Sequence, residues 1–289
     1  MAINERLIHT AADAAGGAAS TEQGLILHLD ANDVDSYDGD GSVWYDISEH
    51  DVTIPLSDNA DNLELHLNAS DSNSYGGSGT TWTDLTSNNN ATVVASTYDI
   101  DNGGYFDITS NTVTFSSNTS ALDTATFSFE MWVYQTSNSG TQYLFSDTGI
   151  SLFTISGTQM RFIKGFSGTN NDDSYFNPTL NSSGWATNKW NHIAVTFSST
   201  TSKVYINGVL VQTHTEGSGT PTALTTLQIS PSLGRWNGYL SAFRVYDITL
   251  SASEVGQNYR HGRDYIYTDL NSNSDLFLHY DPADTNSYS

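Results

Sequence analysis

Residues 188–212 read NKWNHIAVTFSSTTSKVYINGVLVQ, and this stretch indicates the fold. Its first part, residues 192–197, has the pattern of a β-strand that ends at a Ser/Thr turn. Its second part, residues 203–212, is centred on Asn207-Gly208. Because an Asn-Gly pair supplies the two positive-φ positions of a type I′ turn, this part predicts a β-hairpin. The stretch therefore predicts a strand followed by a hairpin.

The middle of the chain has the same β character on either side of this stretch. In residues 127–134, large apolar side chains alternate with other side chains at the period of two that is typical of a strand. We expect one internal helix, which begins where Ser251 and Glu254 form a capping box. Many short strands between Gly, Asn and Ser turns are typical of a sandwich or jelly roll. The predicted fold class is therefore all-β, an antiparallel jelly-roll sandwich.

One motif occurs three times in the chain. Residues 25–46 read LILHLDANDVDSYDGDGSVWYD, residues 63–84 read LELHLNASDSNSYGGSGTTWTD, and residues 276–288 read LFLHYDPADTNSY. We expect the recurring histidines to be hydrogen-bonded structural residues, and Asp46 and Asp84 to accept backbone N–H bonds in the turn that follows. The motif residues that we predict to be structural, together with the hairpin turn, are Trp44, Asp46, Trp82, Asp84, Asn207 and Gly208.

The spacing of the copies predicts the domain organisation. The first two copies begin 38 residues apart, which is too few for a sandwich, and the third begins 213 residues after the second. We therefore expect an orphan opening repeat at 24–56, a complete jelly-roll domain at 61–265, and at 270–289 a linker and the start of a further repeat, with the polypeptide continuing beyond it. Residues 1–20 place Ile, Leu and Ala on one helical face, which predicts a short N-terminal helical anchor; a frayed terminus is the alternative.

Three segments in order resemble the laminin-G-like, concanavalin A-like jelly-roll domains. Residues 188–197 resemble the W-x-H-I-A-x-T strand of this family, residues 204–209 its V-Y-I-N-G hairpin, and residues 238–254 its closing strand and L-S-x-x-E helix. The resemblance covers about 61–265 and implies the same sandwich. It also implies a binding or architectural module, since some members bind glycans and some carry calcium at the rim. The opening motif resembles openings that precede such domains in bacterial surface proteins and phage virion proteins.

Composition excludes several other classes of protein. The absence of Cys excludes a disulfide scaffold, a thiolate zinc site and a Cys nucleophile. The 32 acidic side chains against 9 basic ones give a net charge of −23, which argues against nucleic-acid binding and against docking on anionic membranes. Aromatic residues make up 12% of the chain, too many for a disordered acidic segment. No stretch has the length of a membrane span or the apolar core of a signal peptide.

The resemblance also raises the possibility of an enzyme, because the related fold hosts glucanases. These enzymes need a Glu-x-Asp-x-x-Glu run, which brings two carboxylates to about 5–5.5 Å for retaining chemistry. The nearest run here, FEMWVY at 129–134, contains the single acid Glu130. We therefore predict a protein without catalytic residues or enzymatic activity.

Calcium is the one cofactor that the sequence makes worth considering. The oxygen-rich loop at 165–173, together with Asp147, offers the candidate calcium ligands Asp147, Asn170, Asp172 and Asp173; a solvated loop is the alternative. The opening motif at 33–40 is also rich in Asp, but Trp44 stands where an EF-hand needs a bidentate Glu. The second copy also loses several of these acids. Turn chemistry is therefore the favoured interpretation of the motif.

Aromatic side chains supply the candidate glycan site. Trp185 and Trp236 lie among Gly, Asn and Ser residues, and Tyr239 follows in the predicted closing strand. Aromatic rings exposed in loops would suit a lectin, because they can stack on sugar faces. We therefore predict that Trp185, Trp236 and Tyr239 bind carbohydrate; ordinary packing within the loops is the alternative.

Together these features predict a structural virion protein of a phage, a capsid fibre or decoration protein or a tail fibre component. The domain type is extracellular, yet the chain has Met1 and no export signal, as expected of a protein that is made and assembled in the host cytoplasm. The expected partners are other virion proteins, bound through the N-terminal segment, and cell-surface glycans. The alternatives are a bacterial secreted or surface adhesin, and the carbohydrate-binding appendage of a larger enzyme.

Overall fold

The structure is a computed structural model that describes residues 60–93, 97–100, 104–115, 120–155, 159–167, 184–199, 201–215 and 220–267. Grouping residues that lie close together in space divides the chain into two units, and all of the described residues belong to the unit Ile54–Leu270. The predictions made for 1–20, 24–56 and 270–289, including those for Trp44 and Asp46, lie outside the described residues.

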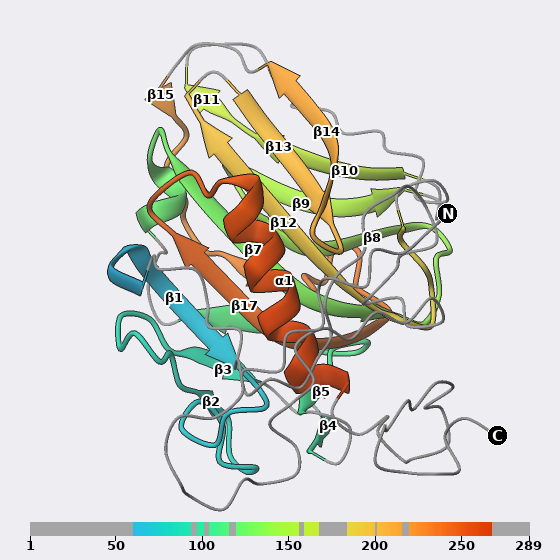
Figure 1. Cartoon of the computed structure of the whole chain (residues 1–289). Helices are drawn as coiled ribbons and strands as arrows, with labels where there is room; N and C mark the ends of the chain where they lie inside the picture. The colour runs from blue at the N-terminus through green and yellow to red at the C-terminus, as the bar shows by residue number, and fades with distance from the viewer. Residues whose placement is uncertain are drawn as a thin grey trace, which may run out of the picture. The chain divides into compact units, whose positions relative to one another are not determined.

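Two antiparallel sheets face each other across the domain (Figure 1). The larger sheet has eight strands in the order β14-β13-β12-β7-β17-β5-β4, and β1 also pairs with β17. Its members are β1 (Leu63–Asn68), β4 (Thr97–Asp99), β5 (Tyr105–Asp107), β7 (Phe127–Gln135), β12 (Trp190–Ser198), β13 (Thr201–Ile206), β14 (Val209–Thr215) and β17 (Gly238–Tyr246).

The smaller sheet has seven strands in the order β10-β9-β8-β16-β6-β3-β2. Its members are β2 (Thr81–Trp82), β3 (Ala91–Val93), β6 (Val113–Phe115), β8 (Thr141–Asp147), β9 (Ile150–Ile155), β10 (Gln159–Lys164) and β16 (Gln228–Ile229). The remaining elements are the short pair β11 (Phe166–Ser167) and β15 (Thr220–Pro221), the 3-10 turns η2 (Ala60–Asn62) and η3 (Ser120–Asp123), and the helix α1 (Ala252–Tyr267). The predicted all-β antiparallel sandwich is confirmed.

The stretch at 188–212 forms strands at the middle and edge of the larger sheet. Strand β12 pairs with both β7 and β13, and the hairpin β13–β14 completes this side of the sheet. The turn residues Asn207 and Gly208 have φ of 50° and 77°, the positive values that a type I′ turn requires. Asn207 also accepts a hydrogen bond from the backbone N–H of His192 at 2.9 Å, which ties the turn to β12.

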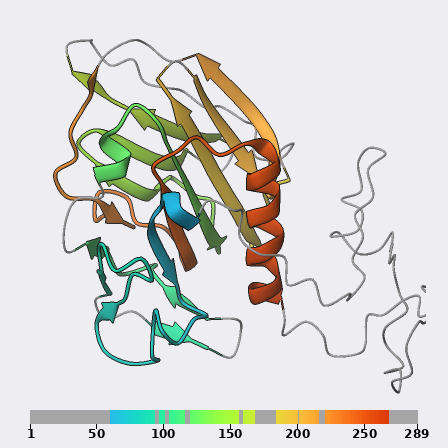
Figure 2. The same ribbon diagram turned by 60° about the vertical axis from the view of Figure 1, so that its left-hand side comes forward.

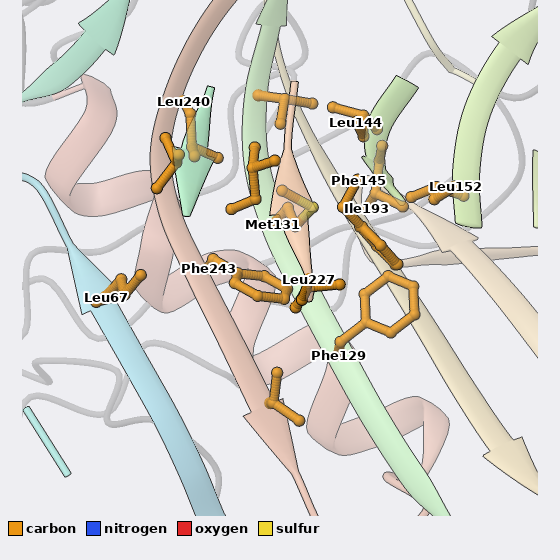
Figure 3. Close-up of a cluster of buried hydrophobic side chains, with 14 of the residues drawn as sticks. Leu67, Phe129, Met131, Leu144, Phe145, Leu152, Ile193, Leu227, Leu240 and Phe243 are labelled. Atoms are coloured by element: carbon orange, nitrogen blue, oxygen red, sulfur yellow. The ribbon is translucent and has the colours of Figure 1, made fainter. Parts of the chain in front are cut away.

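The hydrophobic core lies between the two sheets. Alternate residues of β7, Phe129 and Met131, are fully buried and lie beside Phe243 of β17 (Figure 3). From the smaller sheet, Phe145 and Leu152 complete this part of the core, and the rings of Phe129 and Phe145 meet edge-on at 4.8 Å. Because side chains alternate along a strand, the residues of β7 between these core positions face away from the smaller sheet.

Helix α1 begins as the capping box predicts. Glu254 accepts a hydrogen bond from the backbone N–H of Ser251 at 2.6 Å, and the Ser251 hydroxyl accepts one from the backbone N–H of Glu254 at 3.3 Å. The helix lies against the outer face of the larger sheet (Figures 1 and 2), where Val255 packs with Tyr205 and Tyr246. Among the helices of the described residues, none is long and apolar enough to cross a membrane.

The repeated motif at 63–84 joins the opening strand to the loop between β2 and β3. Trp82 is fully buried, and its ring lies 4.7 Å from that of Phe106. The buried carboxylate of Asp84 accepts hydrogen bonds from four backbone N–H groups. These donors are His66 at 2.8 Å, Thr86 at 3.0 Å, Asn88 at 3.1 Å and Asn89 at 2.9 Å. The Asp84 carboxylate therefore joins strand β1 to the loop, together with the bond from the Leu85 N–H to the His66 carbonyl at 2.9 Å.

We expect Asp84→Ala to lower the free energy of unfolding by about 3 kcal/mol, because four backbone donors, one buried and three partly buried, lose their acceptor. The matched control is Asp71→Ala, since Asp71 accepts a backbone bond from Asn73 within its own turn; we expect it to cost less than about 1 kcal/mol. Urea denaturation followed by circular dichroism measures both values. Equal losses in the two variants would contradict the role assigned to Asp84.

Candidate functional site

The outer face of the larger sheet carries the candidate site. Four aromatic side chains, one from each of four strands, meet there: Tyr105 on β5, Tyr134 on β7, Trp190 on β12 and Tyr239 on β17. Each of them is partly exposed. We call these four residues the four-ring cluster. Its members are far apart in the sequence, and the strand order brings them together.

Register explains how the cluster forms. Tyr134 is the direct cross-strand neighbour of Trp190 on one side and of Tyr239 on the other. Asp107 is the neighbour of Tyr239 on the next strand, and Tyr105 lies two residues before Asp107, on the same face of the sheet. The rings therefore project from adjacent positions of one rigid sheet.

Each of the four rings contacts two of the others. The centroid distances are 4.6 Å for Tyr105–Tyr239, 5.2 Å for Tyr239–Tyr134, 5.6 Å for Tyr134–Trp190 and 5.7 Å for Trp190–Tyr105. The tyrosine pairs are stacked at 26° and 29°, whereas the indole meets its two neighbours at 60° and 72°. Such contacts add about 0.5–1.5 kcal/mol per pair to the burial of the rings, so the cluster is ordered before any ligand arrives.

Two carboxylates lie at one end of the cluster. The Tyr105 hydroxyl donates a hydrogen bond to Asp99 Oδ2 at 3.0 Å, and Asp107 faces Tyr239 across the strand pair. Burial, followed by the hydrogen bond to Asp99, raises the pKa of Tyr105 to about 12. The phenol therefore stays protonated at neutral pH and keeps its role as a hydrogen-bond donor.

Next to the cluster, the same face of the sheet buries a charged network under helix α1. Glu130 is 1% exposed and lies 2.8 Å from Nη1 of Arg244. His192 Nε2 lies 3.4 Å away, and the Tyr246 hydroxyl donates to Oε1 at 3.2 Å. From the helix, Asn258 Nδ2 donates to Oε2 at 3.3 Å. The carboxylate thus connects β7, β12, β17 and α1.

His66, from the repeated motif, completes this network. Its Nε2 accepts a hydrogen bond from Nε of Arg244 at 3.1 Å, which agrees with the structural role expected for this histidine. Burial and the Arg244 guanidinium lower the pKa of His66 to about 3. Burial alone would raise the pKa of Glu130, but His192 and Arg244 outweigh it and lower that pKa to about 2. At neutral pH, His66 is therefore neutral and Glu130 is ionised.

The chemistry available to Glu130 follows from this arrangement. A general acid or a nucleophile must reach the substrate, whereas Glu130 is buried and its carboxylate is held by Arg244 and the helix. Among the described residues, no group of three His, Asp or Glu side chains is placed to hold a metal ion. The surroundings of Glu130 are those of a structural ion pair.

The structure places the three predicted carbohydrate-binding residues differently from one another. Tyr239 belongs to the four-ring cluster. Trp236 is fully buried and donates from Nε1 to the Tyr134 carbonyl at 3.0 Å, while Trp185 is 7% exposed and donates to Gln135 Oε1 at 3.1 Å. Because neither indole offers a face to solvent, the prediction that Trp185 and Trp236 stack on sugars is wrong, and they support β7 from the core side instead.

The predicted calcium ligands are only partly described. Asp147 accepts hydrogen bonds from the backbone N–H and the hydroxyl of Thr225, each at 3.0 Å, and from the backbone N–H of Thr148. Burial alone would raise the pKa of Asp147, but these hydrogen bonds outweigh it and lower that pKa. Asn170, Asp172 and Asp173 lie outside the described residues, so calcium binding there stays a prediction.

Sequence reasoning missed Tyr105, Tyr134 and Trp190 as site residues. One signal was present for Tyr134, because the alternation of residues 127–134 places it opposite the core positions Phe129 and Met131. Tyr105 and Trp190 carry no local signal, since their neighbours in the site come from other strands. Only the order of strands in the sheet reveals the cluster.

Comparison with known proteins agrees with this architecture. A family model described as the concanavalin A-like lectin/glucanases superfamily matches residues 102–256. The chain belongs to this superfamily. The matched residues include strands of both sheets and all members of the four-ring cluster. A search of curated proteins found no match to the chain.

Solved structures that resemble this concanavalin A-like domain include bacterial toxins. One is botulinum neurotoxin type C, described with the dependence of its cell entry on two ganglioside molecules (17% identity, TM-score 0.58, covering 72% of this chain and 53% of that one). Another is the binding domain of botulinum neurotoxin DC in complex with SialylT (16%, 0.56, 70% and 52%). Trypanosoma rangeli sialidase is more distant (16%, 0.50, 73% and 33%). The chain spans about half the length of the neurotoxin domains, and these identities establish a common fold alone.

The charged network predicts how stability depends on pH. An unfolded chain protonates His66 near its ordinary pKa of 6.5, whereas the folded protein does so only near 3. Acid therefore favours the unfolded state, and stability falls as pH drops from 6.5 towards 3. Glu130 adds a loss of the same sign between its ordinary value of 4.5 and about 2. Urea denaturation at several pH values between 7.5 and 4 measures this decline.

The variant His66→Gln separates the histidine from the other groups. The amide oxygen of the glutamine can still accept the hydrogen bond from Arg244, but the amide has no proton that titrates in this pH range. We expect the slope of unfolding free energy against pH between 6 and 4 to decrease by up to about 1.4 kcal/mol per pH unit, the value for one proton. An unchanged slope would show that His66 is protonated to the same extent in the folded and unfolded states, which would contradict the lowered pKa.

Proposed function

We propose that this domain binds cell-surface glycans through the four-ring cluster and does not cleave them. The observation that carries the proposal is the partial exposure of four contacting aromatic rings on a rigid sheet. The apolar C–H face of a pyranose packs on such rings, while the tyrosine hydroxyls, of which that of Tyr105 already donates to Asp99, can accept hydrogen bonds from the hydroxyls of the sugar. The cluster combines both kinds of contact at one place.

The comparisons are compatible with this proposal. Botulinum neurotoxin structures with the same fold are described with gangliosides and with SialylT, so the fold can present a glycan site. The absence of cleavage is supported by the buried ion pair of Glu130 with Arg244, which leaves that carboxylate unable to reach a substrate. Binding without turnover is the function that these groups favour.

The wider setting that we propose is a structural virion protein of a phage, a fibre or decoration component of capsid or tail. The support is the recurrence of the opening motif at 25–46 and 276–288, on either side of a domain of this family, as expected of tandem sandwiches in an appendage. The high negative charge would keep such repeated domains from associating with one another. In this setting, residues 1–20 would attach the chain to other virion proteins.

Binding is tested with Tyr239→Ala and Trp190→Ala on an array of cell-surface glycans. We expect each variant to lose about tenfold in affinity for the glycans that the unaltered protein retains, since each removes one ring of the cluster. The matched control is Tyr143→Ala, because Tyr143 is a partly exposed ring that stacks on Phe153 at 4.6 Å on the smaller sheet. Full affinity in folded Tyr239 and Trp190 variants would refute the assignment of the site.

The virion setting has a separate test. Native source material is fractionated on a density gradient, and peptides in the heavy fractions are identified by mass spectrometry. We expect peptides of this chain to sediment with intact particles. Peptides found only with cell envelopes or soluble protein would refute the virion assignment and favour an adhesin or an enzyme appendage.

A further inference from the structure

We infer that the four-ring cluster selects uncharged glycans and rejects sialylated and other anionic ones, because Asp99 and Asp107 form one end of it. This inference rests on the proposed glycan binding. It goes beyond it in naming the chemical class of the ligand. It also separates this domain from the related structures whose descriptions mention gangliosides or SialylT.

The positions of the two carboxylates follow from strand register. Asp107 is the cross-strand neighbour of Tyr239, and Asp99 is the cross-strand neighbour of Tyr105. On β4, Tyr98 packs against the core, so Asp99, the next residue along the strand, faces outward with Tyr105. Side chains opposite each other in an antiparallel pair begin about 4.5–5.5 Å apart. A sugar that contacts Tyr105 or Tyr239 therefore also lies beside a carboxylate.

Both carboxylates are held in place by hydrogen bonds. Asp99 Oδ2 accepts from the Tyr105 hydroxyl at 3.0 Å, and Asp107 Oδ1 accepts from the backbone N–H of Thr109 at 2.9 Å. An ionised carboxylate can accept about four hydrogen bonds, so the bond from Thr109 leaves Asp107 able to accept from sugar hydroxyls. A neutral sugar supplies such donors, whereas the carboxylate of a sialic acid supplies another negative charge.

The negative charge of the cluster lies at its β4–β5 end. Burial, with contributions from Asp107 and Asp99, raises the pKa of Tyr239, as expected where the local field is negative. The basic residue Lys189 directly precedes Trp190, so it lies at the β12 end of the cluster, whereas Asp99 and Asp107 lie at the β4–β5 end. The chain as a whole carries a net charge of −23, which opposes the approach of anions.

The test uses an array on which each neutral oligosaccharide is also present in its sialylated form. We expect the unaltered protein to bind the neutral member of a pair at least about tenfold more tightly than the sialylated member, because of the two carboxylates. The isosteric variant Asp107→Asn removes the charge but keeps an amide oxygen that can accept a hydrogen bond, so it should reduce this ratio severalfold, whatever its effect on affinity for the neutral glycan. The matched control Asp61→Asn removes an exposed acid on η2 and should leave the ratio unchanged.

A second measurement needs no variant. Raising the ionic strength screens the repulsion, so we expect binding of the sialylated glycans to rise relative to their neutral partners as salt is added. Equal or tighter binding of sialylated glycans by the unaltered protein would overturn the inference and leave glycan binding intact. A ratio that Asp107→Asn and salt both leave unchanged would overturn it too. Failure to bind any glycan would overturn the proposed function itself, which is a different result.

Discussion

The buried carboxylate of Glu130 is the constraint on which the outer face of the larger sheet depends. An ionised group away from water costs several kcal/mol unless it is paired and hydrogen-bonded. Arg244, Tyr246 and Asn258 supply that compensation from β17 and α1. The register of β7 against β17 and the position of the helix must therefore agree with each other, because a one-residue slip would turn Glu130 to the other face of the sheet.

The same register determines the candidate site. Tyr134 lies on β7 four residues beyond Glu130, hence on the same face, and between them Trp132 stacks under Tyr259 of the helix at 5.5 Å. The face is thus divided along its length: the part that contains Glu130 and Trp132 is covered by α1, and the part that contains Tyr134 keeps its aromatic rings partly exposed. Trp190 packs against Trp132 and Ala242 at the boundary. A site built in this way is as rigid as the sheet itself.

The sequence predicts those features that depend on neighbouring residues. The Asn207-Gly208 turn, the Ser251–Glu254 capping box and the acceptor role of Asp84 each arise within a few positions of the chain, and each is present. Trp185 and Trp236 are cases in which neighbouring residues predict the wrong environment for a side chain. Their polar neighbours indicated exposed loops, yet the indoles turn inward and bond to residues of β7. The four-ring cluster joins positions from 105 to 239 through the crossed strand order, and that order is set by long-range pairing that no local pattern contains.

The pairing of β1 with β17 also has a mechanical consequence. Leu63, the first residue of β1, lies opposite Tyr246, the last residue of β17, so the chain enters and leaves this strand pair at the same end. Tension applied at that end would pull the two strands apart sideways and break the hydrogen bonds between them one after another. It would not load all of these bonds at once, as a shearing force along the strands does. The first resistance on the carboxyl side would come from α1, whose Val255 and Asn258 are fully buried against the sheet. A pulled domain of this kind would yield by releasing its helix and then peeling its outer strand, and so would extend at low force.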